Sequence, residues 1–311
     1  MRFNPVHWEA PPAAGLFADP PPRGFWLPDF HVELDALVMA VLLLAVYAVT
    51  IVAARRRGIT YPVGAGRLTA YLAGVLTLFI GSSWPIHDLS EGYLFSMHMV
   101  QHMLFIFLAA PLILWGTPGW MLELVLTPRW LRATAVFCTR PIAAFLIFNL
   151  AQGLLHVPEV TDVIIRNHWL HFLVHLYVVA SSFILWAPVL SPTPLLPRLS
   201  YPIQIVYLML QSAIPTVVYA PLTFAEEVVY AFYGTAPRIW GLSAIHDQQT
   251  AGLLMKVLGG FIMWGWIFVA FFKWANRSEA GLLPNDFQPV DELTPSSAIR
   301  AAEQALRAPK P

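Results

Sequence analysis

Seven stretches of about 20 mostly apolar residues recur along this chain of 311 residues, and a helix of that length crosses the hydrocarbon core of a bilayer. In hydrocarbon, a spanning segment must satisfy its own backbone hydrogen bonds, and an uninterrupted apolar run does so as an α-helix. Charged residues make up 12% of the chain, about half the share that is typical of a soluble domain. We therefore predict an all-α, polytopic membrane protein, a bundle of seven transmembrane helices near residues 34–54, 68–86, 93–115, 141–157, 169–190, 201–220 and 250–274.

The placement of Lys and Arg predicts the orientation of the bundle, because loops that stay in the cytoplasm are enriched in these residues. They concentrate in the links after the first and third predicted spans and in the tail after the seventh. The N-terminus is therefore expected outside and the C-terminus in the cytoplasm. We predict three parts: a Pro-rich outer arm (1–32), a membrane domain (33–276) and a polar cytoplasmic tail (277–311). Residues 224–233 also predict an amphipathic helix on the outer interface.

Charge and cysteine content exclude two classes of function. The formal net charge is zero and no run of basic residues could follow a phosphate backbone, so nucleic acid is not an expected partner. Cys138 is the single cysteine, which excludes an internal disulfide and any paired-cysteine metal or redox motif within this chain. The candidate chemistry therefore lies with the histidines.

The third predicted span carries two histidines, His98 and His102, inside its first turns. Four residues apart on a helix means that both imidazoles point the same way. Ionisable groups inside a bilayer segment are costly, and their presence indicates a functional site. All ten histidines of the chain fall on the predicted outer side of the membrane. The orientation follows from Lys and Arg alone, so the placement of the histidines is an independent observation.

Two more spans present polar side chains on one narrow face. His168, His171 and His175 lie at i, i+3 and i+7 in the fifth span, and such spacing places them on one side of a helix. The fourth span repeats this spacing with Asn149, Gln152 and His156. Because these faces must avoid lipid, we expect the three spans to turn them toward one another.

The residue types favour a bound metal, and copper in particular. Neutral imidazole is a ligand for copper, zinc, iron and nickel, while a thioether is a soft ligand that favours Cu(I). The predicted ligands are His98, His102, His171 and His175, with His168, His87, His156 and His246 as auxiliary ligands or as groups that orient the ligands. Candidate soft ligands are Met97, Met99 and Met103. Acids and amides of the same rim are expected to orient the imidazoles through hydrogen bonds: Asp88, Glu91, Gln101, Asn149, Gln152, Asp247, Gln248 and Gln249.

Other interpretations of these residues stay open. The paired histidines could form a buried polar network that locks helices together, and the methionines could simply fill gaps in the packing. His7 and His31 are expected to be interfacial. A haem protein would use imidazoles of the third and fifth spans as axial ligands of a non-covalent haem. A copper transporter would need a polar path that reaches the cytoplasm.

The same residues carry a family resemblance. The run from Met97 to Leu104, followed by Pro111-Leu112 and Gly116-Thr117-Pro118, resembles the signature of the CtaG-type assembly factors of caa-type cytochrome c oxidase. Further matches cover roughly residues 35–275: Trp84 and Asp88, His156 after Asn149, the segment from His168 to His175, the exit from Pro188 to Pro194, and Asp247-Gln248-Gln249 with Ala251-Gly252.

The resemblance implies a seven-span protein of the bacterial plasma membrane that helps to mature a haem–copper oxidase by handling copper. Its partners would be the catalytic subunit of the oxidase, membrane lipid and a periplasmic copper donor. The site would face the periplasm or cell exterior. Transfer of the ion by ligand exchange needs no bond-making catalysis, so an enzyme is not expected.

Overall fold

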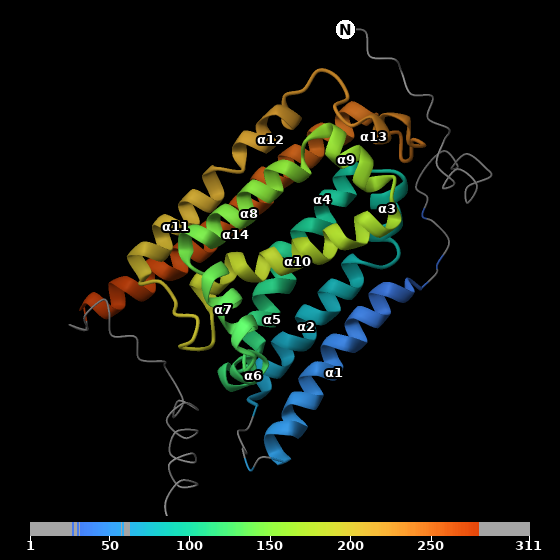
Figure 1. Ribbon diagram of the computed structural model, residues 1–311. Helices are drawn as coiled ribbons and strands as arrows, with labels where there is room; N and C mark the ends of the chain where they lie inside the picture. The colour runs from blue at the N-terminus through green and yellow to red at the C-terminus, as the bar shows by residue number, and fades with distance from the viewer. Residues whose placement is uncertain (1–26, 28–29, 31, 57, 59–62, 280–311) are drawn as a thin grey trace, which may run out of the picture.

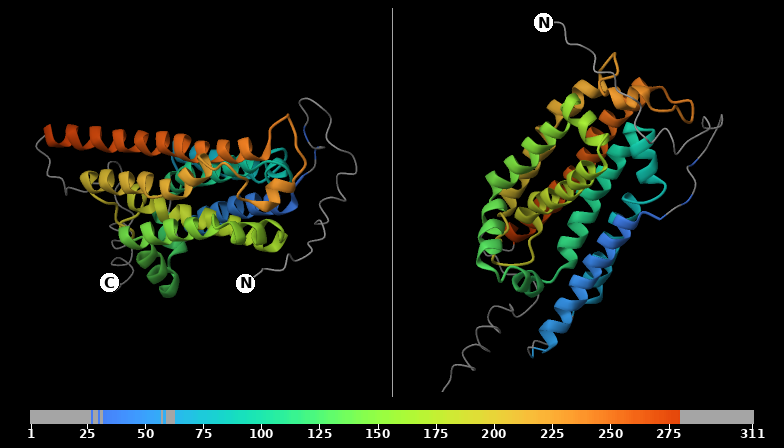
Figure 2. Two further views of the ribbon diagram at one scale, coloured as in Figure 1. Left: turned by 90° about the horizontal axis from the view of Figure 1, so that it is seen from above. Right: turned by 45° about the vertical axis from the view of Figure 1, so that its right-hand side comes forward.

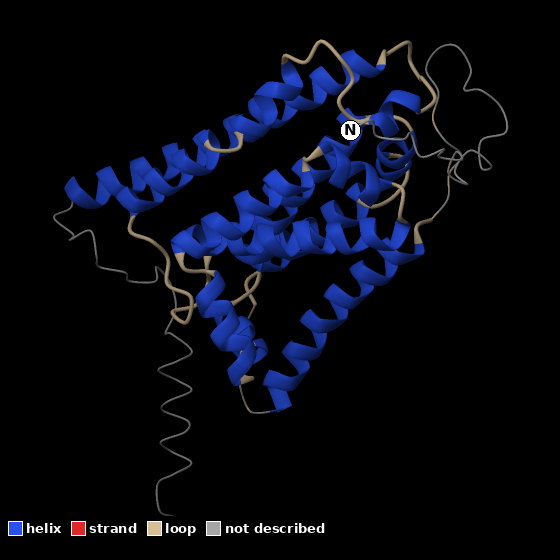
Figure 3. Cartoon of the chain, turned by 45° about the horizontal axis from the view of Figure 1, so that its top comes forward, coloured by secondary structure: helices blue, strands red, loops and turns tan. Residues whose placement is uncertain are grey.

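The structure is a computed structural model that describes residues 27, 30, 32–56, 58 and 63–279, apart from the side chain of His168. The predicted outer arm and polar tail lie almost entirely outside the described residues, as do His7 and His31. Every regular element of the described part is a helix (Figures 1 and 3), which confirms the all-α prediction. The helices are α1 (Leu34–Arg56), α2 (Ala65–Gly81), α3 (Ile86–Gly92), α4 (Phe95–Met103), η2 (Leu104–Ala109), α5 (Ala110–Gly116), α6 (Gly119–Val125), α7 (Arg129–Cys138), α8 (Pro141–Leu155), α9 (Pro158–Ile165), α10 (His168–Leu190), α11 (Tyr201–Ala213), α12 (Thr216–Thr223), α13 (Ala231–Thr235) and α14 (Ala244–Glu279).

Six helical segments among the described residues are long and apolar enough to cross a membrane. A seventh candidate is the pair α7 and α8, which is bent by 79° at the break between the two helices. With 15 residues, α8 rises about 22 Å, which is less than the hydrocarbon core of about 30 Å. The prediction of a seven-span bundle is thus confirmed for six to seven segments: Leu34–Arg56, Ala65–Gly92, Phe95–Gly116, Trp169–Leu190, Tyr201–Thr223, Ala244–Glu279 and the bent pair.

The span Phe95–Gly116 lies at the centre of the bundle. In its most apolar stretch 72% of the residues are buried, against 17% for α1 at the edge of the bundle. Helix α4 packs against α3 and α14, while η2 and α5 pack against α2 and α10. Figure 2 shows the long helix α14 running along one side of this arrangement. The span that carries the paired histidines is therefore the one most shielded from lipid.

The histidines and most of the arginines in the described part gather at opposite ends of the bundle, with Arg166 and Arg238 as exceptions at the end that holds the histidines. In Figure 1, α3, α9, α13 and the first turns of α4, α10 and α14 lie together at one end, which we call the histidine end. It carries His87, His98, His102, His156, His171, His175 and His246. The other end holds the last turn of α1 and the start of α7, with Arg55, Arg56, Arg129 and Arg132.

The central span contains a π-helical segment, η2, directly after the second histidine of the pair. In this segment the Ala110 N–H donates to the carbonyl of Phe105, five residues earlier. The same pattern would pair the Ile106 carbonyl with Pro111, but proline has no N–H to donate. The indole Nε1 of Trp186, on α10, donates to that carbonyl instead at 2.7 Å. The wider turn is therefore tied to α10, and π-helical turns of this kind recur at functional sites.

Small residues bring α2 and α5 into close contact. A Cβ atom at Gly116 would clash with backbone atoms of Arg67 and Tyr71, so only glycine permits this approach. The carbonyl of Gly116 accepts a hydrogen bond from the Tyr47 hydroxyl of α1 at 3.2 Å. Because helices in a bilayer associate through packing of small residues, this contact sets the position of α1 and α2 against the central span.

The predicted amphipathic helix over residues 224–233 is wrong. Residues 224–230 are not helical, and only the short α13 follows. Side chains of α14 take the backbone groups that a helix would use: Gln248 accepts from the Val229 N–H at 2.7 Å and donates to the Glu227 carbonyl at 3.3 Å, while Gln249 donates to the Ala225 carbonyl at 2.9 Å. These long-range bonds replace the local ones.

Changing Trp186→Phe should destabilise the protein by about 1–3 kcal/mol, because it leaves the buried Ile106 carbonyl without a donor. Thermal unfolding of the detergent-solubilised protein measures the effect. Trp264→Phe is the matched control, since the Trp264 side chain is 47% exposed on α14. Equal melting temperatures for the two variants would contradict this account of the π-helical segment.

Candidate metal centre

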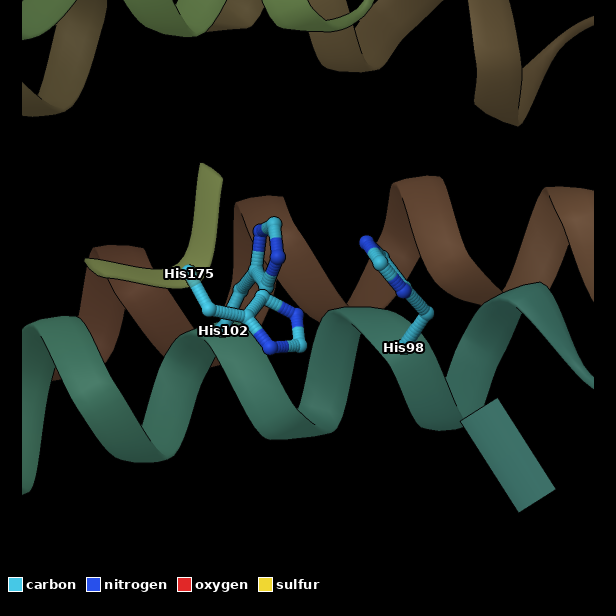
Figure 4. Close-up of side chains that lie close together, drawn as sticks. All are labelled: His98, His102 and His175. Carbon is cyan, nitrogen blue, oxygen red and sulfur yellow. The ribbon is translucent and has the colours of Figure 1, made fainter. Parts of the chain in front are cut away.

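Three histidines from two helices converge at the histidine end of the central span. His98 and His102 come from α4 and His175 comes from α10 (Figure 4). One ligand nitrogen from each ring lies within 4.8 Å of the others. The ring centroids are 4.4 Å apart for His98 and His102, 6.0 Å for His98 and His175, and 5.7 Å for His102 and His175. We call these three residues the histidine centre.

The start of α4 is fixed by a carboxylate from another helix. Asp247 of α14 is fully buried and accepts hydrogen bonds from the N–H groups of Phe95 at 2.7 Å and Ser96 at 3.0 Å. A negative charge at a helix N-terminus satisfies unpaired N–H groups and complements the helix dipole. Asp247 thereby sets the direction in which α4 presents His98 and His102.

Glu91 of α3 joins two further histidines. Its Oε1 lies 2.7 Å from Nδ1 of His171 and 3.2 Å from Nε2 of His87. A carboxylate accepts hydrogen bonds, so Nδ1 of His171 carries the proton and Nε2 of that ring is left with a free lone pair. This carboxylate–histidine pairing is the arrangement that orients imidazole ligands in metal sites. The ring of His171 stacks on that of His98 with centroids 5.4 Å apart.

Hydrogen bonds occupy both ring nitrogens of His87. Its Nε2 donates to Glu91, while its Nδ1 lies 3.1 Å from the amide Nε2 of Gln101 and accepts from it. The same Gln101 amide donates to the Gly81 carbonyl at 2.9 Å, and its Oε1 lies 3.1 Å from the Ser90 hydroxyl. His87 therefore has no ring nitrogen left for an ion, and it helps to hold Glu91 in place.

Tyr233 supports this network from a part of the chain that the sequence analysis did not connect with it. Burial raises the pKa of the Tyr233 hydroxyl well above its usual range, and the nearby carboxylates of Asp247 and Glu91 raise it further. The hydroxyl therefore stays protonated and donates to the Ser90 carbonyl at 2.7 Å. The two residues are 143 positions apart, and no local pattern in the sequence links them.

Two cavities border these histidines. A small one has a free volume of about 20 Å³, enough for one water molecule or ion, and is lined by His98, His102, His156, His171 and Met99 among other residues. A larger one of about 200 Å³ lies among α1, α2 and α10, is mostly apolar, and touches His87 and His175. The histidines that line one cavity do not line the other.

The remaining predicted residues are distributed more widely. Met97 packs among Leu89 and Tyr93, and Met103 belongs to the apolar cluster that also contains Phe95 and Met255. His246 is exposed in the first turn of α14. Asp88 lies in the first turn of α3, and the side chain of His168 lies outside the described part.

The predicted amides mostly serve contacts between helices. Asn149 donates to the Phe145 carbonyl at 2.9 Å and to the Gln211 side chain at 2.7 Å. Gln152 contributes its carbonyl to the ring of His156 at 2.7 Å. Gln248 binds the backbone of the loop before α13. Of the amides predicted to orient an imidazole through the side chain, Gln101 contacts one directly.

Unpaired ring nitrogens concentrate at this site. Among the described residues, five buried imidazole nitrogens have no hydrogen-bond partner: His98 Nδ1 and Nε2 of His102, His156, His171 and His175. A buried polar atom without a partner costs about 1–3 kcal/mol, and native proteins contain few of them. Nitrogen lone pairs gathered in one buried place fit the ligands of a transition metal.

Changing Glu91→Gln should lower the affinity for Cu(I) by roughly 10–100-fold, because the amide cannot fix the proton of His171 on Nδ1 as a carboxylate does. Competition with a coloured Cu(I) chelator measures the affinity. Glu226→Gln, an exposed acid of the loop at the same end, is the matched control. An affinity unchanged in Glu91→Gln would show that Glu91 does not orient a ligand.

Comparison with known proteins matches the chain to one family. The family described as cytochrome c oxidase caa3 assembly factor (Caa3_CtaG) matches residues 45–277. Uncharacterised proteins of Mycobacterium bovis and Mycobacterium tuberculosis are each 28% identical to it over 250 residues, and one of Mycobacterium leprae is 27% identical over 247 residues. Each alignment covers 74% of this chain and 36% of the relative, so the chain spans about a third of the length of these curated relatives. No solved structure matches the chain.

Proposed function

Because the chain belongs to the cytochrome c oxidase caa3 assembly factor family, we propose that it binds a copper ion at the histidine centre and passes the ion to the catalytic subunit of the oxidase. The ion is cargo in this proposal. It moves by exchange of ligands, and no covalent bond of a substrate is made or broken. The protein would thus act in assembly without being an enzyme.

The observation that carries this proposal is the group of nitrogen atoms of His98, His102 and His175 within 4.8 Å of one another. Three neutral imidazoles make a ligand set suited to copper, zinc, iron or nickel. The family narrows this choice, since a haem–copper oxidase needs copper. The buried thioether of Met99 beside the same rings adds a soft ligand type that favours Cu(I).

The proposed direction of transfer follows from the two ends of the bundle. Positive charge favours the cytoplasmic side of a membrane, and Arg55, Arg56, Arg129 and Arg132 lie at the end opposite the histidines. The histidine end would therefore face the periplasm. There it would receive copper from a periplasmic donor and meet the oxidase subunit in the same membrane.

The two cavities beside the histidines argue against the haem alternative. Of the described histidines, the larger one touches only His87 and His175, and hydrogen bonds occupy both ring nitrogens of His87. The cavity that touches four of the histidines has a free volume of about 20 Å³. This space suits a single ion or water molecule, while a porphyrin is far larger.

The variant His98→Ala with His102→Ala should lose bound copper, while the parent protein should carry about one equivalent per chain. Elemental analysis of the detergent-purified proteins measures both. His246→Ala is the matched control, because His246 is exposed and belongs to the same end. Copper retained in full by the double variant would exclude the histidine centre as the binding site.

Copper binding should weaken as the pH falls. A proton and a copper ion compete for the same ring nitrogen, so the neutral imidazole is the form that binds. Chelator competition at a series of pH values tests this expectation. An affinity that does not fall before the protein unfolds in acid would indicate ligands other than imidazole.

A further inference from the structure

The small cavity beside the histidine centre brings together two histidines that are not part of that centre. It lies between α4, α8, α9 and α10, and His156 and His171 both line it. We infer that this cavity is a second metal position, in which His156 and His171 bind the ion that the histidine centre also binds. The inference rests on the proposed function and divides the proposed site into two neighbouring positions.

Protein acceptors fix the protons of both rings on Nδ1. Glu91 accepts from Nδ1 of His171 at 2.7 Å, and the Gln152 carbonyl accepts from Nδ1 of His156 at 2.7 Å. A neutral imidazole carries one proton, so Nε2 is a bare lone pair in each ring. Both Nε2 atoms are buried and have no hydrogen-bond partner.

The other polar side chain that lines this cavity is already satisfied. The hydroxyl of Thr161 donates to the Leu155 carbonyl at 2.6 Å and also lies 3.1 Å from that of Val157. The imidazole nitrogens are therefore the polar side-chain atoms of this lining that remain for an ion. The free volume of about 20 Å³ fits one ion.

The two positions share a wall. His98 and His102 belong to the histidine centre and also line the small cavity, whereas His175 does not line it. An ion bound to His98 and His102 could therefore exchange its third ligand, His175, for His156 and His171. Two cations held so close together in a medium of low dielectric would repel each other strongly, so one ion is expected to occupy either position.

The test uses three variants of the full chain: His175→Ala, His156→Ala, and the two changes combined. With a single ion and two alternative positions, the binding constants of the two positions add. Each single variant should therefore keep about one equivalent of Cu(I), and the variant that spares the stronger position should bind within about twofold of the parent. The combined variant should lose at least about 100-fold in affinity. Titration of Cu(I) against a coloured chelator measures all of them, with His246→Ala as control.

Two outcomes would overturn the second position. If His175→Ala alone loses as much affinity as the combined variant, the ion depends on the histidine centre only. If the combined variant binds copper as the parent does, neither position exists as described. A parent protein without copper would instead contradict the proposed function, and this result is distinct from the other two.

The melting temperature of each variant, compared with that of the parent protein, shows whether a lower copper affinity comes with a loss of structure. His175→Gln and His156→Gln keep a polar side chain at each place, and they should reproduce the pattern of the alanine variants if the imidazole nitrogen is what matters. If the variant with both glutamine changes binds Cu(I) as tightly as the parent protein does, the inference is also overturned.

Discussion

Every polar atom buried in this bundle needs a partner, because lipid and apolar side chains offer none. The Ile106 carbonyl, left without an N–H by Pro111, takes the indole of Trp186. The first N–H groups of α4 take the carboxylate of Asp247. Against this background the five unpaired imidazole nitrogens stand out, since among the described residues they make up nearly half of the buried side-chain atoms without a hydrogen-bond partner and come from one end of the bundle.

Glu91 links the fold to the chemistry of the site. It accepts hydrogen bonds from two histidines on different helices, and so it holds α3 and α10 together while it decides which nitrogen of His171 is free. Its effect depends on Gln101, which binds the other nitrogen of His87 and keeps that ring turned toward the carboxylate. The stretch from Gly81 to His102 therefore supplies two members of the histidine centre, His98 and His102, together with the groups that orient His171.

Much of the architecture could be predicted from the sequence, because hydrophobic length and helical spacing are local properties. The spacing of His98 and His102 predicts that they share a face, and the spacing of His171 and His175 predicts the same for α10. The family resemblance, carried by these motifs, is confirmed by the match over residues 45–277. The expectation that the histidine-bearing spans face one another agrees with the contacts between rings of α4 and α10.

What the sequence could not predict depends on contacts between distant segments. The loop after α12 has the pattern of an amphipathic helix, but Gln248 and Gln249 take its backbone groups. Tyr233 reaches Ser90 from a separate part of the chain. The π-helical segment depends on two residues of different helices: Pro111 cannot donate to the Ile106 carbonyl, and Trp186 donates to it instead. Periodicity within one segment contains no information about such partners.

The π-helical segment has a consequence for the length of the central span. A π-helix has more residues per turn than an α-helix, so the six residues of η2 turn through roughly the same angle as five α-helical residues. Removing one residue between Leu104 and Ala109 would therefore allow an ordinary α-helix while Gly116 keeps its register with His98 and His102, and its close contact with Tyr71 would persist. The same deletion in an α-helical part of the span would rotate all that follows by about 100°. The π-helical segment is thus a place where the central span can change its length by one residue and keep both ends in position.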